Sequence, residues 1–458
     1  MSSGFDIEDT IVAISTPPGI GAIGMIRLSG PNAIVVVNRV FSKDILNAKG
    51  YSLHFGQILL GEVVLDEVLV SLFRGPKSFT RQDVVEVSFH GSPYILQEGL
   101  QLFLKHGARL ANAGEFTQRA YLNGAFDLAQ AEAVADLIAS TSKAAHQLAM
   151  GQMRGQVSHE LRDLRMQLLD FTSLIELELD FGEEDVEFAD RGQFLDLIEA
   201  MRVRLRGLIR SFHFGNAVKS GVPTVIMGRP NAGKSTLLNQ LLQDDRAIVS
   251  EVAGTTRDVI EDRLVLDGIE FRLMDTAGIR VTEDLIEKEG VARSEALAEK
   301  ASLVLYVFDP EEMDLADAQR YVEGLDLPPG AVVLFLGNKV DLLVEQERRG
   351  GLHRDVIWIS ARDGLGMDVL CDKMVSAVRG LIDRPDEEVI ISNVRHVEAL
   401  RQTLLALDEV AEGIAAGLPS DLMTIDIRMA LHYLGGITGE ISTDEVLGNI
   451  FGKFCIGK

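Results

Sequence analysis

Gly228-Arg229-Pro230-Asn231-Ala232-Gly233-Lys234-Ser235 lies between an apolar, strand-like run at residues 222–227 and a helix-like run at residues 236–242. This stretch fits the pattern Gly-x-x-x-x-Gly-Lys-[Ser/Thr] in the strand, loop and helix context that the pattern requires. Its glycines let backbone N–H groups turn towards phosphate oxygens at the start of a helix, where the helix dipole adds positive charge. Lys234 is expected to reach the β and γ phosphates, and Ser235 to bind Mg²⁺. The stretch therefore predicts a nucleotide-binding loop on an α/β fold.

The sequence on both sides of this loop predicts the rest of that fold. Apolar runs at residues 222–227, 271–274, 303–308, 331–336 and 356–359 alternate with helix-like segments. Such alternation is typical of a parallel sheet that is covered by helices. We therefore predict a nucleotide-binding domain at residues 221–381.

Further motifs follow strand-like runs of this domain. Asp275-Thr276-Ala277-Gly278 would place a carboxylate near Mg²⁺ and a glycine amide near the γ-phosphate. In Asn338-Lys339-Val340-Asp341 the carboxylate can accept the N1–H and N2–H₂ donors of guanine, which adenine lacks, so GTP is predicted and not ATP. Ser360-Ala361 lies where a backbone loop would contact guanine. Gly254-Thr255-Thr256 stands where a switch segment would bind Mg²⁺, with Thr256 as the ligand.

The residues expected around GTP come from these motifs and their neighbours. They are Asn231, Ala232, Gly233, Lys234, Ser235, Thr236, Ser250, Glu251, Val252, Ala253, Gly254, Thr255, Thr256, Asp275, Thr276, Ala277, Gly278, Asn338, Lys339, Asp341, Ser360, Ala361 and Arg362. Ile279 stands where a Ras-like enzyme carries the glutamine that orients the attacking water. The sequence identifies no arginine finger either, so a bound cation or a partner must neutralise the charge on the transferred phosphoryl group.

The remaining sequence predicts two other kinds of structure. Residues 1–122 read as short β-branched strands joined by turns, with helix-like runs at residues 34–41 and 95–106, and predict an α+β domain. Residues 123–220 and 382–458 have helical periodicity. The economical arrangement is one helical domain that is split in sequence, with the P-loop GTPase domain inserted into it.

The composition narrows the class of protein. A chain of 458 residues with 47% apolar residues suggests about three domains. Its net charge of −25 argues against a protein that coats nucleic acid unaided. The two cysteines, Cys371 and Cys455, cannot form a disulfide framework and indicate a reducing compartment. The start lacks a signal-peptide core, and the longest apolar runs fall short of the roughly 18 residues of a membrane span, so we expect a cytoplasmic protein without a membrane partner.

The whole chain resembles the tRNA-modifying GTPase family MnmE, also called TrmE. The resemblance is carried by Thr16-Pro17-Pro18-Gly19, Arg27-Leu28-Ser29-Gly30, Asp127-Leu128-Ala129-Gln130-Ala131-Glu132-Ala133, the inserted GTPase domain and Phe454-Cys455-Ile456-Gly457-Lys458. It implies a homodimer that works with an FAD- and NADH-using partner, MnmG or GidA, in a heterotetramer or larger complex. That complex would add an aminomethyl or carboxymethylaminomethyl group to carbon five of the wobble uridine of tRNA, which would be bound mainly through the partner.

The resemblance also implies ligands for individual residues. The carbon would come from a tetrahydrofolate, in the 5-formyl or methylene form, bound by a folate and dimerisation domain at residues 1–122. The family's folate contacts fall on Arg27, Glu86 and Lys458, whereas a family lysine in the turn before the long helix falls near Ala125, which has no charge. Potassium would supply the positive charge that an arginine finger lacks here, and it would be held by Asn231, Ser250, Val252 and Thr255.

Two implied catalytic residues have ordinary alternatives. Glu287 matches the family's proposed water-orienting acid, but it can also be a carboxylate on a helix surface. Cys455 matches a functionally important cysteine, but it can also be a free thiol on a terminus. Because Gly457 and Lys458 do not suit a prenylation signal, lipidation is rejected. Covalent attack, proton transfer and positioning of the tail all stay open for Cys455.

A second function class shares the GTPase motifs. Ribosome-assembly GTPases are pure GTP switches with the same order of motifs, and they usually append basic RNA-binding modules. This chain instead adds an α+β domain and a cysteine-bearing tail, with a net charge of −25. The modification enzyme is therefore the preferred hypothesis, and the ribosome-assembly switch is the alternative.

Overall fold

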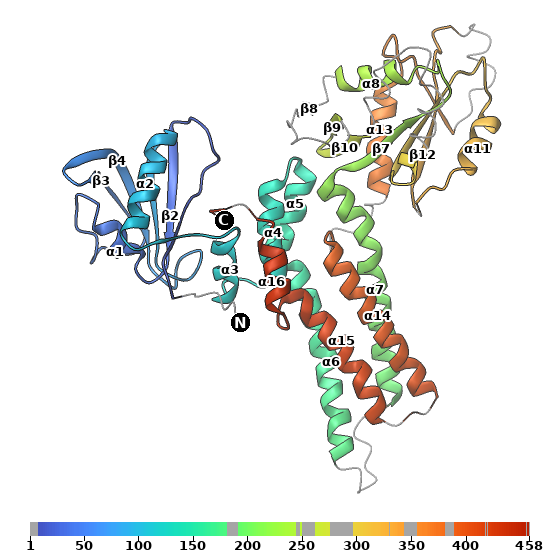
Figure 1. Ribbon diagram of the computed structural model, residues 1–458. Coiled ribbons are helices and arrows are strands. Elements are labelled where there is room, and N and C mark those ends of the chain that lie inside the picture. The colour runs from blue at the N-terminus through green and yellow to red at the C-terminus, as the bar shows by residue number, and fades with distance from the viewer. Residues whose placement is uncertain are drawn as a thin grey trace. The chain divides into compact units, whose positions relative to one another are not determined.

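The computed structural model describes residues 8–180, 191–243, 248–249, 262–274, 296–328, 330–342, 355–380, 389–416, 418, 420–454 and 456–457. The chain divides into two compact units (Figure 1). The first unit contains residues 1–135, 153–161 and 434–458. The second unit contains residues 136–152 and 162–433.

The first unit is built on a six-stranded sheet in the order β3-β4-β5-β2-β1-β6. Residues 68, 70 and 72 of the longest strand are buried and the residues between them face outwards, which is the period of a strand with one covered face. The elements are β1 Ile11–Ile14, β2 Ile23–Ser29, α1 Ala33–Asn38, β3 Ser52–Leu60, β4 Val63–Phe73, β5 Val84–His90, α2 Pro93–Lys105 and β6 Arg109–Leu110. Apolar residues of α1 and α2 join the sheet in one core, and the predicted α+β fold is confirmed.

Strand β3 is absent from the prediction. Gly56 and Gln57 interrupt its apolar run, and glycine weakens an isolated strand signal. The strand forms because it pairs with β4 along its length, which places Phe55 opposite Leu69. Both of these side chains lie on the exposed face of the sheet.

The C-terminal segment returns to the first unit. Helix α3 (Glu115–Leu122), the start of α4 (Leu128–Ala139) and α16 (Asp444–Phe451) share a small apolar core. The Tyr121 hydroxyl donates to the Gly439 carbonyl at 2.7 Å. Ile456 then forms an isolated antiparallel bridge with Ala113. Residues that are more than 300 positions apart in the chain therefore share one compact unit.

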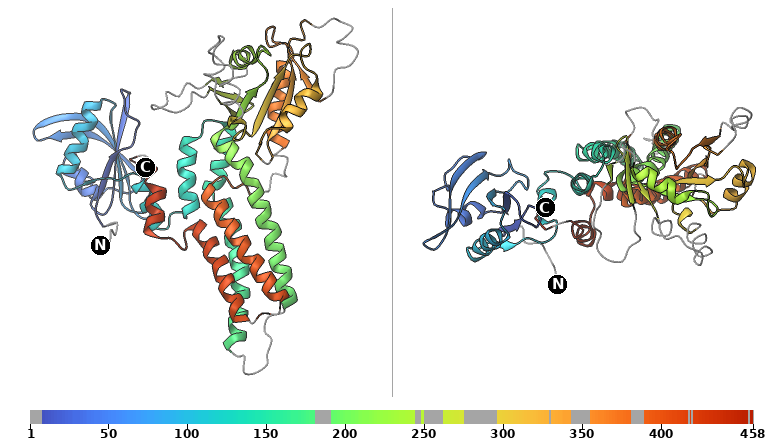
Figure 2. Two further views of the ribbon diagram at one scale, coloured as in Figure 1. Left: turned by 45° about the vertical axis from the view of Figure 1, so that its right-hand side comes forward. Right: turned by 90° about the horizontal axis from the view of Figure 1, so that it is seen from above.

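The second unit contains long helices that come from both sides of the nucleotide-binding domain. They are α5 Lys143–Met153, α6 Gln156–Asp180, α7 Arg191–Ser220, α14 Val394–Ala415 and α15 Ser420–Thr438, of which residues 153, 156–161 and 434–438 belong to the first unit. Figure 2 shows α7 and α14 side by side. Gln152 Nε2 donates to Ser392 Oγ at 2.9 Å, and the Ile391 N–H donates to Ser211 Oγ at 3.0 Å. The helical domain is therefore split in sequence, as predicted, while the boundaries at residues 122, 220 and 381 stay predictions.

The inserted domain has a seven-stranded sheet in the order β13-β12-β11-β7-β10-β9-β8. Strands β7, β10, β11, β12 and β13 are parallel, and β9 and β8 add an antiparallel edge. The elements are β7 Val222–Met227, α8 Lys234–Gln243, β8 Ile248–Val249, β9 Asp262–Leu266, β10 Ile269–Leu273, β11 Leu303–Phe308, α11 Leu315–Glu323, β12 Val332–Gly337, β13 Val356–Trp358 and α13 Met367–Gly380.

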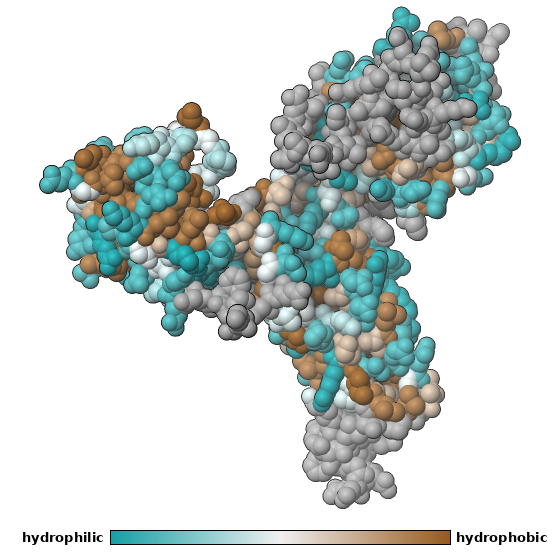
Figure 3. Space-filling model, viewed as in Figure 1, coloured by the Kyte–Doolittle hydropathy of each residue, from teal (hydrophilic) through white to brown (hydrophobic). Residues whose placement is uncertain are grey.

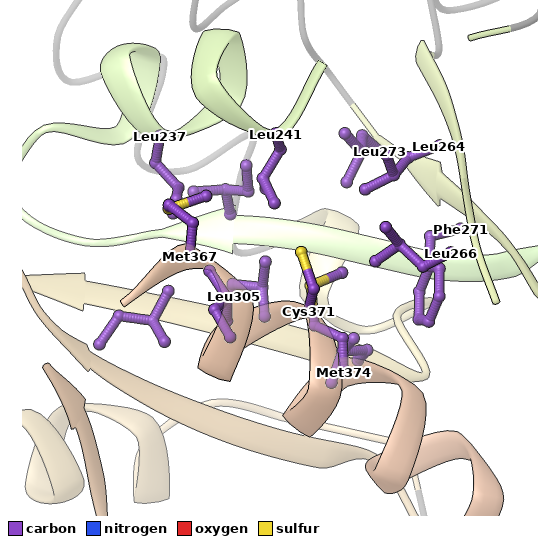
Figure 4. Packing of buried hydrophobic residues seen from close by; sticks show 14 of the residues in the cluster. Leu237, Leu241, Leu264, Leu266, Phe271, Leu273, Leu305, Met367, Cys371 and Met374 are labelled. Atoms are coloured by element: carbon purple, nitrogen blue, oxygen red, sulfur yellow. The ribbon is translucent and has the colours of Figure 1, made fainter. Parts of the chain in front are cut away.

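Both faces of this sheet are buried, which explains why its central strands are apolar without alternation. On one face, Leu237 and Leu241 of α8 and Met367, Cys371 and Met374 of α13 pack against the strands (Figure 4). On the other face, residues of α11 pack against β7 and β11. The predicted P-loop fold is confirmed. Within the described ranges, no helix is both long enough and apolar enough to cross a membrane.

Candidate functional site

The predicted nucleotide motifs that lie within the described residues meet at one edge of the inserted sheet. The 228–235 loop follows β7, Asp309 follows β11, residues 338–341 follow β12, and Ser360 and Ala361 follow β13. Because these four strands are parallel neighbours, their carboxyl ends lie together, which is where open α/β sheets bind ligands.

The shape of the phosphate-binding loop depends on two glycines. Gly228 has a φ of +146°, and a Cβ atom there would overlap the carbonyl oxygen of Val307 in β11. Gly233 has a φ of +97°, and a Cβ atom there would overlap Nδ2 of Asn338. Both positions therefore need glycine for the backbone conformation and for the close approach of a neighbour.

Lys234 occupies the inside of the loop. Its Nζ donates to the carbonyl oxygens of Gly228 at 2.9 Å and Arg229 at 2.8 Å. Helix α8 begins at Lys234, so the ammonium group, which contacts the loop carbonyls, lies near the helix N-terminus, and Ser235 is in its first turn. That combination attracts anionic oxygens and suits phosphate groups.

Asn338 ties two loops of the site together. Its side chain is buried, Nδ2 donates to the Ala232 carbonyl at 2.8 Å, and Oδ1 accepts from the Ala361 N–H at 2.9 Å. The first bond fixes the phosphate loop and the second fixes the loop after β13. The sequence assigned this residue to the guanine motif and did not indicate that it connects the two loops.

Lys339 is held by a carboxylate that the sequence analysis did not select. Its Nζ lies 2.7 Å from Oδ2 of buried Asp309, and this hydrogen bond raises the pKa of the Lys339 ammonium group. The residue also has a φ of +66°, which bends the backbone two residues before Asp341. Asp341 is half-buried in this bend. Lys339 pairs with Asp309 and not with Asp341, and the contact of Asp341 with guanine stays a prediction.

Several predicted residues lie outside the described residues. They are Ser250, Glu251, Val252, Ala253, Gly254, Thr255, Thr256, Asp275, Thr276, Ala277, Gly278, Glu287, Cys455 and Lys458. Their assignments to GTP, Mg²⁺, K⁺, folate and catalysis stay predictions. Of the described members, Ala361 is buried, Arg362 is exposed, and Asn231 is exposed with a φ of +61°.

A second polar site lies in the first unit. Arg27 of β2 and Glu86 of β5 are directly paired in the register of the two strands. Arg27 Nε and Nη2 lie 2.9 and 2.8 Å from Oε1 of Glu86, and both side chains keep about a fifth of their surface exposed, 22% and 20%. Among the described residues, Oε2 of Glu86 has no hydrogen-bond donor. The pair therefore offers an acceptor at the protein surface.

Two aromatic rings lie beside Arg27, and a third lies beside one of them. The Arg27 guanidinium carbon lies 5.7 Å from the ring centre of Phe116 and 5.8 Å from that of Phe79. The Phe79 ring lies 5.9 Å from the Phe126 ring. Sequence reasoning missed these three rings, because they are far apart in the chain and no local pattern joins them.

The C-terminal tail approaches the same strands. A Cβ atom on Gly457 would lie 2.5 Å from the carbonyl oxygen of Ile14 in β1. Ile14 pairs with Ile26, the residue before Arg27. Ala125 is half-buried, and its N–H donates to the Ala120 carbonyl at 2.8 Å. The tail and Arg27 therefore lie on the same strand pair, while position 125 contributes no charge.

Two protein-family models match the chain. The model described as the MnmE helical domain matches residues 128–455, and the one described as the GTP-binding protein TrmE N-terminus matches residues 10–125. A tRNA modification GTPase MnmE from Cytophaga hutchinsonii is 52% identical over 98% of both chains. The proteins of the same name from Flavobacterium psychrophilum and Bacteroides thetaiotaomicron are 49% and 47% identical over 98% of this chain and 99% and 100% of their own.

Proposed function

Since the chain belongs to the MnmE family of tRNA modification GTPases, we propose that it is a potassium-activated GTPase that modifies the wobble uridine of tRNA. With an FAD- and NADH-using MnmG-type partner, it adds an aminomethyl or carboxymethylaminomethyl group to carbon five of that base. A tetrahydrofolate supplies the carbon. The observation that carries this proposal is that one chain contains two sites. One joins a phosphate-binding loop to the guanine motif, and the other is the Arg27–Glu86 pair with aromatic rings nearby.

Different residues of the inserted domain bind the phosphates, the metal ions and the guanine base. Lys234 and the N-terminus of α8 hold the phosphates, and Ser235, in the first turn of that helix, would bind Mg²⁺. Asp341 accepts the guanine N–H donors. Of the four residues predicted to hold K⁺, Asn231 lies within the described residues, and it is exposed on the phosphate loop. A cation there would neutralise the charge that develops during phosphoryl transfer.

The side chains around the Arg27–Glu86 pair in the first unit fit a folate. A pterin ring offers several N–H donors, and Oε2 of Glu86 is a free carboxylate acceptor among the described residues. Phe79 and Phe126, which are partly exposed, offer flat apolar surface for the ring, whereas Phe116 is buried beside Arg27. Folate, when bound, carries the one-carbon unit. The protein residues bind it and orient it, and Gly457 of the C-terminal tail lies beside Ile14 of β1, which belongs to the same sheet.

An exposed apolar surface supports a homodimer. Phe55 of β3 and Leu69 of β4 are cross-strand neighbours, 55% and 41% exposed, and Leu53 beside them is 62% exposed. Figure 3 shows further apolar residues at the surface of the first unit, in the view of Figure 1. Large exposed apolar patches mark interaction sites, so a second copy of the N-terminal domain would cover it.

Mass spectrometry of tRNA nucleosides tests the proposed function. Cells that lack the gene would be complemented with the natural protein, Glu86→Gln, or Cys455→Ser. We expect the modified wobble uridine to vanish in the deletion strain and to return with the natural protein only. If Cys455→Ser also restores it, the enzyme assignment stands and Cys455 loses its role. If the modification persists in the deletion strain and no second copy explains it, the ribosome-assembly switch replaces this proposal.

A further inference from the structure

Ala125, in the turn before α4, lacks the positive charge that would bind a folate carboxylate at this place in the first unit. The turn at residues 123–126 leads from Asn123 to Phe126, whose ring lies beside Phe79. A ligand held between Glu86 and these rings would pass this turn. The anionic glutamate part of a folate would then require a cation that Ala125 cannot provide.

Arg81 brings a guanidinium group to that turn. Its Nη1 donates to the Asn123 carbonyl at 3.1 Å, and a Cβ atom on Gly124 would lie 3.5 Å from the same nitrogen. The Arg81 backbone has a φ of +58°, a conformation that side chains other than glycine, asparagine and aspartate rarely adopt. An arginine in that conformation costs backbone energy, and functional sites are where such strain is retained.

The segment that carries Arg81 is fixed to the folate-type site on both sides. Asn123 Nδ2 donates to the Thr80 carbonyl at 2.7 Å, and the Thr80 hydroxyl lies 2.7 Å from the Ser29 hydroxyl. Ser29 is at the end of β2, the strand of Arg27, and Phe79 faces Arg27. Arg81 is therefore held beside the turn by a short chain of contacts that starts at the site.

The Arg81 guanidinium also keeps its charge available. Within the described part of the chain no carboxylate pairs with it, and its side chain is exposed. Neighbouring arginines are engaged elsewhere: Arg109 with Asp9 and Glu115, and Arg74 with the Leu46 and Ala48 carbonyls. One guanidinium N–H is used by Asn123, and the planar fork has four more to offer.

We propose that Arg81 binds the glutamate carboxylates of the folate and replaces the cation missing at position 125. This inference rests on the proposed folate site and deepens it. A guanidinium is suited to the role because it binds carboxylates in a bidentate manner and stays charged at every physiological pH.

Isothermal titration of the full-length protein tests the assignment without measuring activity. The ligands are 5-formyltetrahydrofolate and 5-formyltetrahydropteroate, which lacks the glutamate. Arg81→Gln keeps a donor for the Asn123 carbonyl and removes the charge. Lys77→Gln is the matched control, because Lys77 is an exposed basic residue of the same loop, and within the described part of the chain no hydrogen bond or ion pair joins it to the turn. In the double variant Arg81→Gln with Ala125→Lys, a lysine within the turn itself replaces the positive charge of Arg81.

We expect Arg81→Gln to lower the affinity for 5-formyltetrahydrofolate about tenfold, which corresponds to the loss of one charge-assisted contact. Lys77→Gln should change this affinity less than about twofold, as for a solvated surface charge. The double variant should recover most of the loss, and the pteroate should bind the natural protein and Arg81→Gln equally. Equal folate affinity of Arg81→Gln and the natural protein would overturn the inference and leave the folate site standing.

Two other outcomes would also decide against Arg81. An equal loss for both ligands, or no recovery in the double variant, would assign its effect to the shape of the loop and not to its charge. If the natural protein binds neither ligand, the proposed folate site fails and the inference fails with it. Thermal unfolding of each variant identifies any that are misfolded, and Arg81→Asn, which suits a positive φ, then takes the place of Arg81→Gln.

Discussion

Removing the side chain of Asn338 tests whether the GTP site depends on the connection between its two loops. Asn338→Ala deletes a buried carboxamide and leaves the Ala232 carbonyl and the Ala361 N–H without their partners. Each orphaned buried group costs about 1–3 kcal/mol, so the substitution should lower the free energy of unfolding of the inserted domain by about 2–6 kcal/mol. That is a large part of the stability of about 5–15 kcal/mol that is typical of a domain.

The single tryptophan makes this measurement specific to the inserted domain. Trp358 lies in β13, and its fluorescence during urea titration reports the unfolding of this domain within the full chain. A urea dependence of about 2 kcal/mol per molar converts the expected loss into a midpoint lowered by about 1–3 M. The matched control is Asn239→Ala, which truncates an exposed asparagine on α8.

The outcome that would refute the reasoning is a midpoint for Asn338→Ala that matches the natural protein and Asn239→Ala. GTP affinity gives a second readout, because the phosphate loop and the loop after β13 both lose a fixed position. We expect GTP binding to weaken in Asn338→Ala even at low temperature, where the domain is folded. Unchanged affinity together with lowered stability would show that the connection serves folding and not nucleotide binding.

Three further predictions concern other parts of the chain. Asp341→Asn should lower GTP affinity about a hundredfold or more while XTP affinity rises, because the amide donates to the second carbonyl of xanthine; an equal loss for both nucleotides in titration calorimetry would contradict this. Burial raises the pKa of the Glu115 carboxyl, but hydrogen bonds from Arg109, the Asn112 N–H and Arg119 outweigh it and set the pKa below its ordinary value. Its contribution to stability is therefore present above an unfolded pKa of about 4 and is lost as the pH falls further, so circular dichroism during acid titration should show a shallower loss for Glu115→Gln than for the natural protein. Gly228→Ala should abolish GTP binding, because the new methyl group would overlap the Val307 carbonyl; filter binding at normal affinity would show that the loop can adjust.

The sequence was sufficient for the P-loop fold and for the order of the nucleotide motifs. Each motif is a short contiguous stretch, and its flanking strand and helix are visible in the same few residues. Residues 338–341 and 228–235 could be assigned to one nucleotide site from the sequence alone, because in a parallel sheet the loops after neighbouring strands lie at one edge. The apolar runs of β7, β11 and β12 indicated burial on both faces for the same local reason.

Other elements were beyond local reasoning. Strand β3 has a weak pattern, since Gly56 and Gln57 interrupt it, and its pairing with β4 decides its conformation. The end of the chain forms a bridge with Ala113 that no periodicity near Ile456 could indicate. Such contacts arise because the packing of distant segments, and not local propensity, determines the free energy of these elements.

The sequence by itself determined that the chain carries a GTP-binding domain inserted into helices, because that information is written in consecutive residues. Only the tertiary structure decided which groups the side chains of the sites contact. Asn338 reaches Ala232 across 106 positions, and Arg27 reaches Glu86 across 59. Asp309 holds Lys339, and Arg81 lies against the turn of Ala125. The physical reason is that a hydrogen bond or an ion pair depends on a separation of about 3 Å in space, and separation along the chain says nothing about it.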